Sequence, residues 1–127
     1  MKLDYKFIKQ LLEAMENYDE HQITMEKLMN FMAINDDNVD KFVGHIKILV
    51  DYNCLDASSM DLGFKFSING SLTINSGERY RLTARGYEFL DILKQDTIFN
   101  KIKDHAISTA FEVGKSLLTE YLVGFTK

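Results

Sequence analysis

Apolar side chains recur at helical spacing in three successive segments, residues 3–18, 24–33 and 38–52. In each segment they follow the i, i+3, i+4, i+7 pattern that places them on one face of a helix, with polar residues on the other face. The apolar positions are Ile8, Leu11, Leu12 and Met15, then Met25, Leu28, Met29 and Met32, then Val39, Phe42, Val43, Ile46, Leu49 and Val50. Three helices joined by short connections predict a helix-turn-helix arrangement.

Polar residues stand where these helices are expected to begin and end. Asp4 and Thr24 are expected N-caps of the first two helices, and Asp37 or Asn38 of the third, because their side chains can accept from free amides of a first turn. Asn53 follows the third helix. Since asparagine tolerates the left-handed conformation, we expect the helix to end there.

After Asn53 the hydrophobic period changes from 3.6 to 2. The alternating apolar positions are Phe64, Phe66 and Ile68, followed by Leu72 and Ile74. Asn69 and Gly70 separate these two runs, and an Asn-Gly pair in this position predicts a hairpin with a type I′ turn. Residues 54–58 and 79–83 are expected flanking strands. The fold class is therefore α+β, a winged helix-turn-helix with an antiparallel wing that contains an extra hairpin.

The pattern returns to helix in the last third of the chain. Thr83 is an expected cap of one helix, Asp96 an expected start of the next, and residues 107–125 form a final helix with an apolar stripe. We divide the chain into a winged-helix domain, residues 1–95, and a C-terminal helical extension, residues 96–127.

The stripe of the final helix approximates a 3.5-residue repeat, which is wide enough to pack on a partner helix. We expect a homodimer through this helix, and the alternative is that the helix folds back and completes the core of the monomer. The expected interface residues are Phe111, Gly114, Leu118, Tyr121, Leu122 and Phe125.

Composition places the chain among ordinary globular domains. Its 127 residues are 46% hydrophobic and 27% charged, with a formal net charge of −4, which argues against intrinsic disorder. No run approaches the roughly 18 apolar residues of a membrane span, and no signal peptide is recognisable. We therefore expect a cytoplasmic protein that does not contact a membrane.

Two stretches resemble known winged-helix regulators. HIKILVDYNCL, residues 45–55, resembles the end of a recognition helix, with Asn53 in place of the usual glycine, and RLTARGYEFLDILKQDTIF, residues 81–99, resembles the segment that closes a wing. Together with the opening MKLDYKFIKQLLEAME, they resemble a family of short bacterial and prophage proteins classed as a domain of unknown function. The resemblance implies a winged-helix fold with a C-terminal helical extension and a phage or prophage origin. It implies no functional residues.

No constellation for catalysis or metal binding is recognisable. The three histidines lie on different predicted elements, and none is spaced i, i+4 from another, so a zinc site has no support. Cys54, the single cysteine, is expected to be a buried thiol rather than a nucleophile. We expect a protein that is not an enzyme and has no cofactor and no metal.

DNA binding is the first functional interpretation, with the protein acting as a transcriptional regulator. In a helix-turn-helix the outer face of the third helix enters the major groove, and wing residues contact backbone phosphates. The candidate nucleic-acid-binding residues are Asn38, Lys41 and His45 on the helix, and Lys65, Arg79, Arg81 and Arg85 on and beside the wing. Duplex DNA is the expected partner.

Acidic residues argue against DNA binding. Residues 35–62 contain six acidic and two basic residues, and Asp36, Asp37 and Asp40 crowd the start of the third helix, whereas a DNA-binding surface is normally basic. The arginines have a simpler interpretation as surface charges paired with Glu78 or Glu88. The alternative function is therefore a protein-protein interaction module, a phage protein that binds a host or defence protein.

Overall fold

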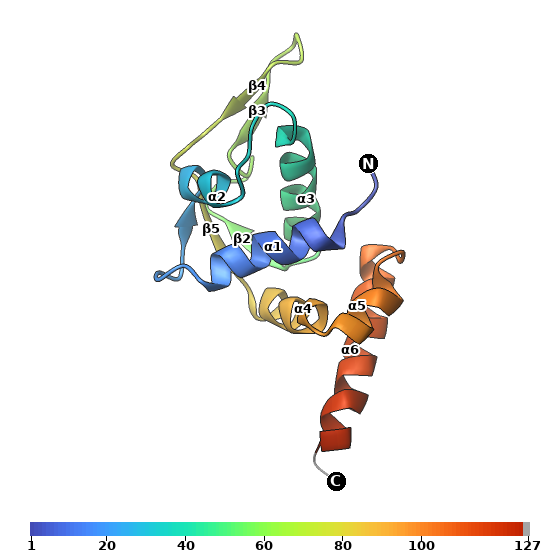
Figure 1. Cartoon of the computed structure of the whole chain (residues 1–127). Helices are drawn as coiled ribbons and strands as arrows, with labels where there is room; N and C mark the ends of the chain where they lie inside the picture. Colours follow the sequence, from blue (N-terminus) through green and yellow to red (C-terminus); the bar gives the residue numbers. More distant parts are fainter. Residues whose placement is uncertain (126–127) are drawn as a thin grey trace.

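The computed structural model describes residues 1–125, with Phe125 described for its backbone only. Within these residues the protein is a mixed α+β structure of six helices and two small antiparallel sheets. The elements in chain order are α1 (Tyr5–Glu16), β1 (Ile23–Thr24), α2 (Met25–Phe31), α3 (Val39–Asp51), β2 (Leu55–Ala57), β3 (Phe64–Phe66), β4 (Leu72–Ile74), β5 (Arg79–Leu82), α4 (Ala84–Lys94), α5 (Asp96–Ile102) and α6 (Ile107–Phe125). The β3–β4 hairpin lies at one end of the molecule, and α6 extends away from the other end (Figure 1).

Side-chain caps begin three of the helices where the sequence predicts them. The Asp4 side chain accepts from the Phe7 amide at the start of α1, and the Thr24 side chain accepts from the Lys27 amide at the start of α2. At the start of α4, the Thr83 side chain accepts from the Gly86 amide. Each cap satisfies an amide that has no partner within its helix. These three predictions are confirmed.

Asn53 has the positive φ of 61° that its position after α3 predicts. This left-handed residue turns the chain so that β2 can pair with β5. The register sets Leu55 opposite Leu82 and Ala57 opposite Tyr80.

The first sheet has three strands in the order β1-β5-β2, all antiparallel. Strand β1 is only two residues long and was not predicted, because two residues give no alternation to recognise. Ile23 is buried opposite Tyr80 on β5. The strand therefore ties the α1–α2 connection to the centre of the sheet.

The second sheet is the β3–β4 hairpin, in which Phe64 pairs with Ile74 and Phe66 with Leu72. The predicted hairpin is confirmed, but the predicted type I′ turn is wrong, because Gly70 has a positive φ of +84° while Asn69 does not. The Gly70 amide instead donates to the Ser67 carbonyl, so Asn69 lies inside a turn that Gly70 ends. The ring of Phe64 is buried and contacts Phe42 edge-on at 6.1 Å. This contact fixes the base of the hairpin against α3.

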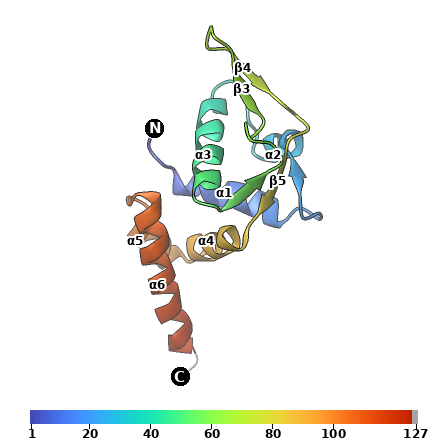
Figure 2. The ribbon, with the colours of Figure 1, turned by 180° about the vertical axis from the view of Figure 1, so that it is seen from behind.

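Helices α4, α5 and α6 pack on one another, and α4 also packs on α1 (Figure 2). Phe89 on α4 contacts Tyr5 of α1 on one side and Phe111 of α6 on the other, with ring centroids 6.2 Å and 5.8 Å apart. One continuous core therefore runs from α1 into the first half of α6.

Candidate interaction surface on α3 and the hairpin

Helix α3 has one face in the core and one face in solvent. Phe42, Ile46 and Leu49 are fully buried. The outward positions are Asp40, Gly44, Lys47, Ile48 and Asp51. Asp36 and Asp37 are exposed immediately before the helix and add two more carboxylates. The outward face of α3 is therefore anionic at its first turn and weakly charged further along.

Asn38, a predicted DNA-reading residue, closes the turn before α3. Its Oδ1 accepts from the Asn35 amide at 2.7 Å, and its Nδ2 donates to the Ala33 carbonyl at 3.3 Å. It stands at the N-cap position of α3 but makes no capping hydrogen bond. The prediction that Asp37 or Asn38 caps α3 through its side chain is therefore wrong for Asn38, because its side chain turns back onto residues 33–35.

Lys41 is held by Asp4, which precedes α1. Its Nζ donates to Asp4 Oδ2 at 2.5 Å and lies 4.9 Å from the centre of the Phe7 ring. Burial acts to raise the pKa of Asp4, but hydrogen bonds from Lys41 and from the Phe7 amide outweigh burial and lower it. The charge of Lys41, a second predicted DNA contact, is therefore largely neutralised by a partner within the chain.

His45, the third predicted contact on this helix, is fully buried. Its Nδ1 lies 2.7 Å from the Lys41 carbonyl, and its Nε2 accepts from the Asp4 amide at 3.0 Å. Burial lowers the pKa of the imidazole. The expectation that His45 faces DNA is corrected, because the ring lies beneath residues 1–7. The spacing could have indicated this, since position 45 is three residues after Phe42 and four before Leu49.

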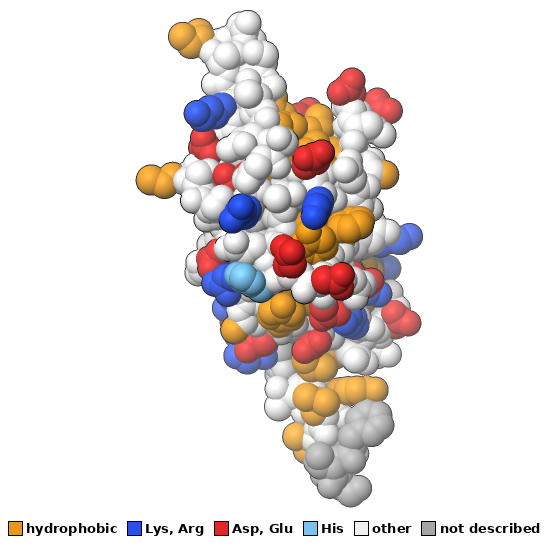
Figure 3. Space-filling model, turned by 90° about the vertical axis from the view of Figure 1, so that its left-hand side faces the viewer, with side chains coloured by type: hydrophobic (Ala, Val, Ile, Leu, Met, Phe, Trp, Pro, Cys, Tyr) orange, Lys and Arg blue, Asp and Glu red, His pale blue; other side chains and the backbone are white. Residues whose placement is uncertain are grey.

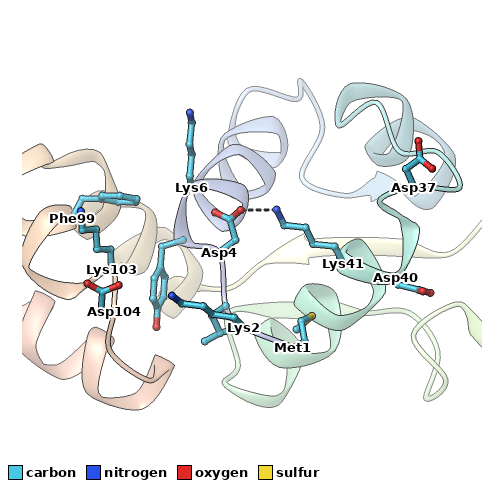
Figure 4. A pocket seen from close by; sticks show the side chains of 12 residues that line it. Met1, Lys2, Asp4, Lys6, Asp37, Asp40, Lys41, Phe99, Lys103 and Asp104 are labelled. Carbon is cyan, nitrogen blue, oxygen red and sulfur yellow. Dashed lines mark hydrogen bonds and ion pairs between the residues drawn. The ribbon is translucent and has the colours of Figure 1, made fainter.

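A groove of about 770 Å³ lies where residues 1–6 pass between α3 and the end of α5 (Figure 4). The ion pair of Asp4 and Lys41 lies in the middle of this groove. Asp37 and Asp40 line one end and Lys103 lines the other. The groove is open to solvent and of mixed charge, so it has no bias toward a ligand of one sign.

The hairpin contacts the outward side of α3 through a cation and an aromatic ring. Lys47 Nζ lies 4.8 Å from the centre of the Phe66 ring. Phe66 is 54% exposed, and Ile68, beyond the end of β3, is fully exposed. Lys65, a predicted phosphate contact, alternates to the other face of β3 and lies 3.9 Å from Asp61. An exposed apolar edge of the hairpin therefore lies next to Lys47 on the outward face of α3.

The three arginines do not form one basic patch. Arg79 is exposed on β5, and Arg81 pairs with Asp56 across the sheet. Arg85 is half-buried, with its guanidinium 3.8 Å from the centre of the Phe111 ring. Of the predicted basic contacts on the sheets, Arg79 is exposed, Lys65 is exposed but lies 3.9 Å from Asp61, and Arg81 is paired with Asp56.

Cys54 is buried, as predicted. Burial raises the pKa of its thiol to about 11, although Arg85 acts in the opposite direction. The side chain is a neutral thiol near pH 7, and it packs at the junction of α3 and β2.

Glu78 has a role that the sequence did not predict. It is 2% exposed, and its carboxylate accepts from Ser58 Oγ at 2.8 Å, the Ser59 amide at 2.8 Å and Ser59 Oγ at 2.6 Å. The suggestion that Glu78 is a surface partner of an arginine is therefore wrong. The carboxylate joins the loop after β2 to the start of β5, and so fixes the base of the hairpin. A single acidic residue before a strand gives no sequence pattern that distinguishes a buried position.

A family model was matched over residues 2–112, and its description is a hypothetical protein, DUF2513. The chain belongs to the DUF2513 family. This confirms the predicted membership of a family with a domain of unknown function. No curated protein and no solved structure matched the chain.

Charges of both signs are interspersed on one face of this DUF2513 protein. In the face shown in Figure 3, Lys and Arg side chains alternate with Asp and Glu over the body of the molecule, and hydrophobic side chains gather at the end formed by α6. On this face there is no continuous basic stripe of the kind that is typical of DNA-binding domains.

Helix α6 is buried in its first half and exposed in its second. Phe111 is 3% exposed, and a Cβ added at Gly114 would lie 2.5 Å from Ile92 of α4. These two predicted interface residues are therefore occupied within the monomer. Leu118 is half-buried, and Tyr121 and Leu122 are 45% and 56% exposed. The side chain of Phe125, the last predicted interface residue, lies outside the described part of the structure.

Within residues 1–125 of the DUF2513 protein, no three His, Cys, Asp or Glu side chains converge in a way that could hold a metal ion. Over the same residues, every helix is too short or too polar to cross a bilayer.

Proposed function

We propose that this DUF2513 protein is a winged-helix protein. The order α1-β1-α2-α3-β2-β5 with an antiparallel β1-β5-β2 sheet supports this fold. The β3–β4 hairpin, inserted between β2 and β5, is the wing. In this arrangement α3 is the recognition helix and its outward face is the working surface.

On this frame we propose a non-enzymatic protein-interaction module, with a partner protein that presents a basic surface to α3 and the hairpin. The observation that supports a protein partner is the anionic first turn of α3. Asp36, Asp37 and Asp40 are exposed there, while Lys41 is paired with Asp4. The same carboxylates would approach phosphates if α3 entered a major groove.

The magnitude of this repulsion favours a protein partner over DNA. Two like charges 4 Å apart repel by about 4 kcal/mol at the effective dielectric constant near a protein surface. Several such contacts would have to be offset by cations, and a DNA-binding helix normally supplies these cations itself. Opposite charges on a protein partner instead steer association and fix its orientation.

The exposed apolar edge of the hairpin supports the same proposal. Phe66, which contacts Lys47 of α3, and Ile68 are exposed and provide apolar area, which a protein interface needs at its centre. The carboxylates then form part of the polar rim.

We propose a second copy of the chain as the partner of the exposed half of α6. The stripe that packs on α4 and α5 through Phe111 and Gly114 continues along the helix as Leu118 and Leu122. A two-fold pair of α6 helices would bury this continuation.

DNA binding through the wing remains the second candidate. Lys47, Lys65 and Arg79 are exposed, and the proposed winged-helix frame is one on which such residues contact phosphates. These contacts would be of the backbone type, which position a protein without reading sequence.

Charge reversal on α3 distinguishes the two functions. The chain is used to capture partners from a nuclease-treated lysate of its native cells, in parallel with an Asp37→Lys/Asp40→Lys variant and a Glu112→Lys control on α6. A protein retained by the wild type and the control, but lost by the variant, supports the module.

Binding to random duplex DNA is measured alongside at low and physiological salt. If the charge-reversed variant binds DNA more weakly than the wild type, the electrostatic argument is wrong. A wild-type chain that binds DNA with a steep salt dependence, and captures no protein, supports the second candidate.

A further inference from the structure

Residues 1–4 precede α1 and lie against α3 at three points. The Asp4 amide donates to His45 Nε2, and the Asp4 carboxylate accepts from Lys41 Nζ. At the start of the segment, Met1 covers Gly44, where an added Cβ would lie 2.5 Å from the methionine sulfur. The segment therefore covers part of the outward face of α3.

The hydrogen bonds of His45 are compatible with one protonation state. An imidazole nitrogen can accept only when it carries no proton. Because Nε2 accepts from the Asp4 amide, Nδ1 must carry the proton and donate to the Lys41 carbonyl. A doubly protonated ring would place the Nε2 proton against the Asp4 amide proton, and the bond between His45 and Asp4 would be lost.

The surroundings of the ring also oppose a charge on it. His45 is fully buried, and the Phe7 ring lies 5.1 Å from it. The charged groups that act on the ring are Lys41, one turn earlier on α3, and Asp4, before α1. Burial lowers the pKa of His45, and the charge of Lys41 lowers it further, while the Lys41 carbonyl and the Asp4 carboxylate act in the opposite direction.

We infer that residues 1–4 are a pH-sensitive cover on the outward face of α3, which neutral His45 holds in place and protonated His45 releases. In the released state the ring is solvated and regains the ordinary histidine pKa of about 6.5. A group whose pKa is lower in the closed state favours the open state in acid, so the cover loosens as the pH falls below this value.

Release would uncover Gly44 and free Lys41 from Asp4. This consequence rests on the proposed function, because the uncovered face is the one that we assign to a partner. The cover itself does not depend on that function and can be tested on the isolated chain. A failure of either proposal is thus distinguishable from a failure of the other.

The test is a nuclear magnetic resonance titration of the full chain from about pH 7.5 to about pH 4.5, which spans the ordinary histidine pKa and leaves most carboxylates ionised. The His45 ring, the Asp4 amide and the order parameters of residues 2–4 are followed together. We expect the Asp4 amide to shift with the midpoint of His45, and the order parameters to fall from about 0.85 to below about 0.6.

A His45→Gln variant sharpens the test, since a glutamine can accept from the Asp4 amide and donate to the Lys41 carbonyl without titrating. We expect residues 2–4 of this variant to stay ordered throughout. His105→Gln replaces an exposed histidine and is the matched control, which should behave as the wild type.

Three results would overturn the inference. The first is a His45 that titrates while residues 2–4 stay ordered, as would happen if the Asp4 carboxylate paired with the charged ring. The second is loosening with the same midpoint in His45→Gln. The third is unfolding of the whole chain before His45 titrates. If His45→Gln does not fold, the wild-type titration still tests the inference. The pH midpoint at which residues 2–4 lose order must then match the midpoint measured for the His45 ring rather than that of another histidine.

Discussion

Replacing Glu78 with alanine tests whether one buried carboxylate holds the hairpin to the rest of the protein. Its three hydrogen bonds to Ser58 and Ser59 join the loop after β2 to β5. A hydrogen bond to a charged group contributes about 1.5–3 kcal/mol. The serine hydroxyls can recover bonds to water, because both serines are exposed. Removing the carboxylate also removes the cost of burying its charge, which is several kcal/mol and offsets part of the loss.

We therefore expect Glu78→Ala to lower the free energy of unfolding by about 2–4 kcal/mol, less than the sum of its bonds. Urea unfolding at pH 7, followed by circular dichroism, measures this change. Glu112→Ala removes an exposed carboxylate from α6 and should change stability by no more than about 0.5 kcal/mol.

A local readout separates a hairpin effect from a general one. The largest amide shift changes in Glu78→Ala should occur in residues 58–66 and 74–79, which the carboxylate joins. If Glu78→Ala unfolds at the same urea concentration as Glu112→Ala, the carboxylate does not fix the hairpin and the reasoning fails.

Three further predictions concern packing, self-association and reactivity. Gly86→Ala should destabilise the protein by about 1–3 kcal/mol in the same urea assay, because its Cβ would lie 2.2 Å from the Cys54 carbonyl. Gly124→Ala, where the added Cβ meets nothing within 4 Å, is the control, and equal stability of the two variants would contradict the packing. Leu122→Lys should halve the mass measured by light scattering while Thr119→Lys leaves it unchanged, and a wild-type monomer would refute the α6 dimer. The Cys54 thiol, with its pKa raised to about 11, should react with iodoacetamide at pH 8 only in denaturant, so rapid reaction of the folded chain would show that it is accessible.

The proposed function depends on how charge is distributed rather than on its total. The net charge of −4 is compatible with either a DNA or a protein partner. Three features of α3 favour a protein: its first turn is acidic, its Lys41 is paired with Asp4, and its His45 is buried. The first feature adds negative charge to the face that a regulator would offer to DNA, and the other two remove a cation and a hydrogen-bonding side chain from it.

The sequence by itself determined the local elements of this protein. The caps at Asp4, Thr24 and Thr83 and the left-handed Asn53 are set by residues within a few positions of one another. The same holds for the hairpin at Asn69-Gly70 and for the helical stripes, whose period is visible in any short window. These predictions needed no knowledge of the rest of the chain.

The tertiary structure alone decided the candidate site. His45 accepts from Asp4 across 41 positions, and Glu78 binds Ser59 across 19. Strand β1 exists only because β5 lies beside it. A polar side chain on a helix or strand has the same local pattern whether it faces solvent or a buried partner. Its burial and protonation state are set by which distant segment packs over it, and only the folded chain brings that segment into contact.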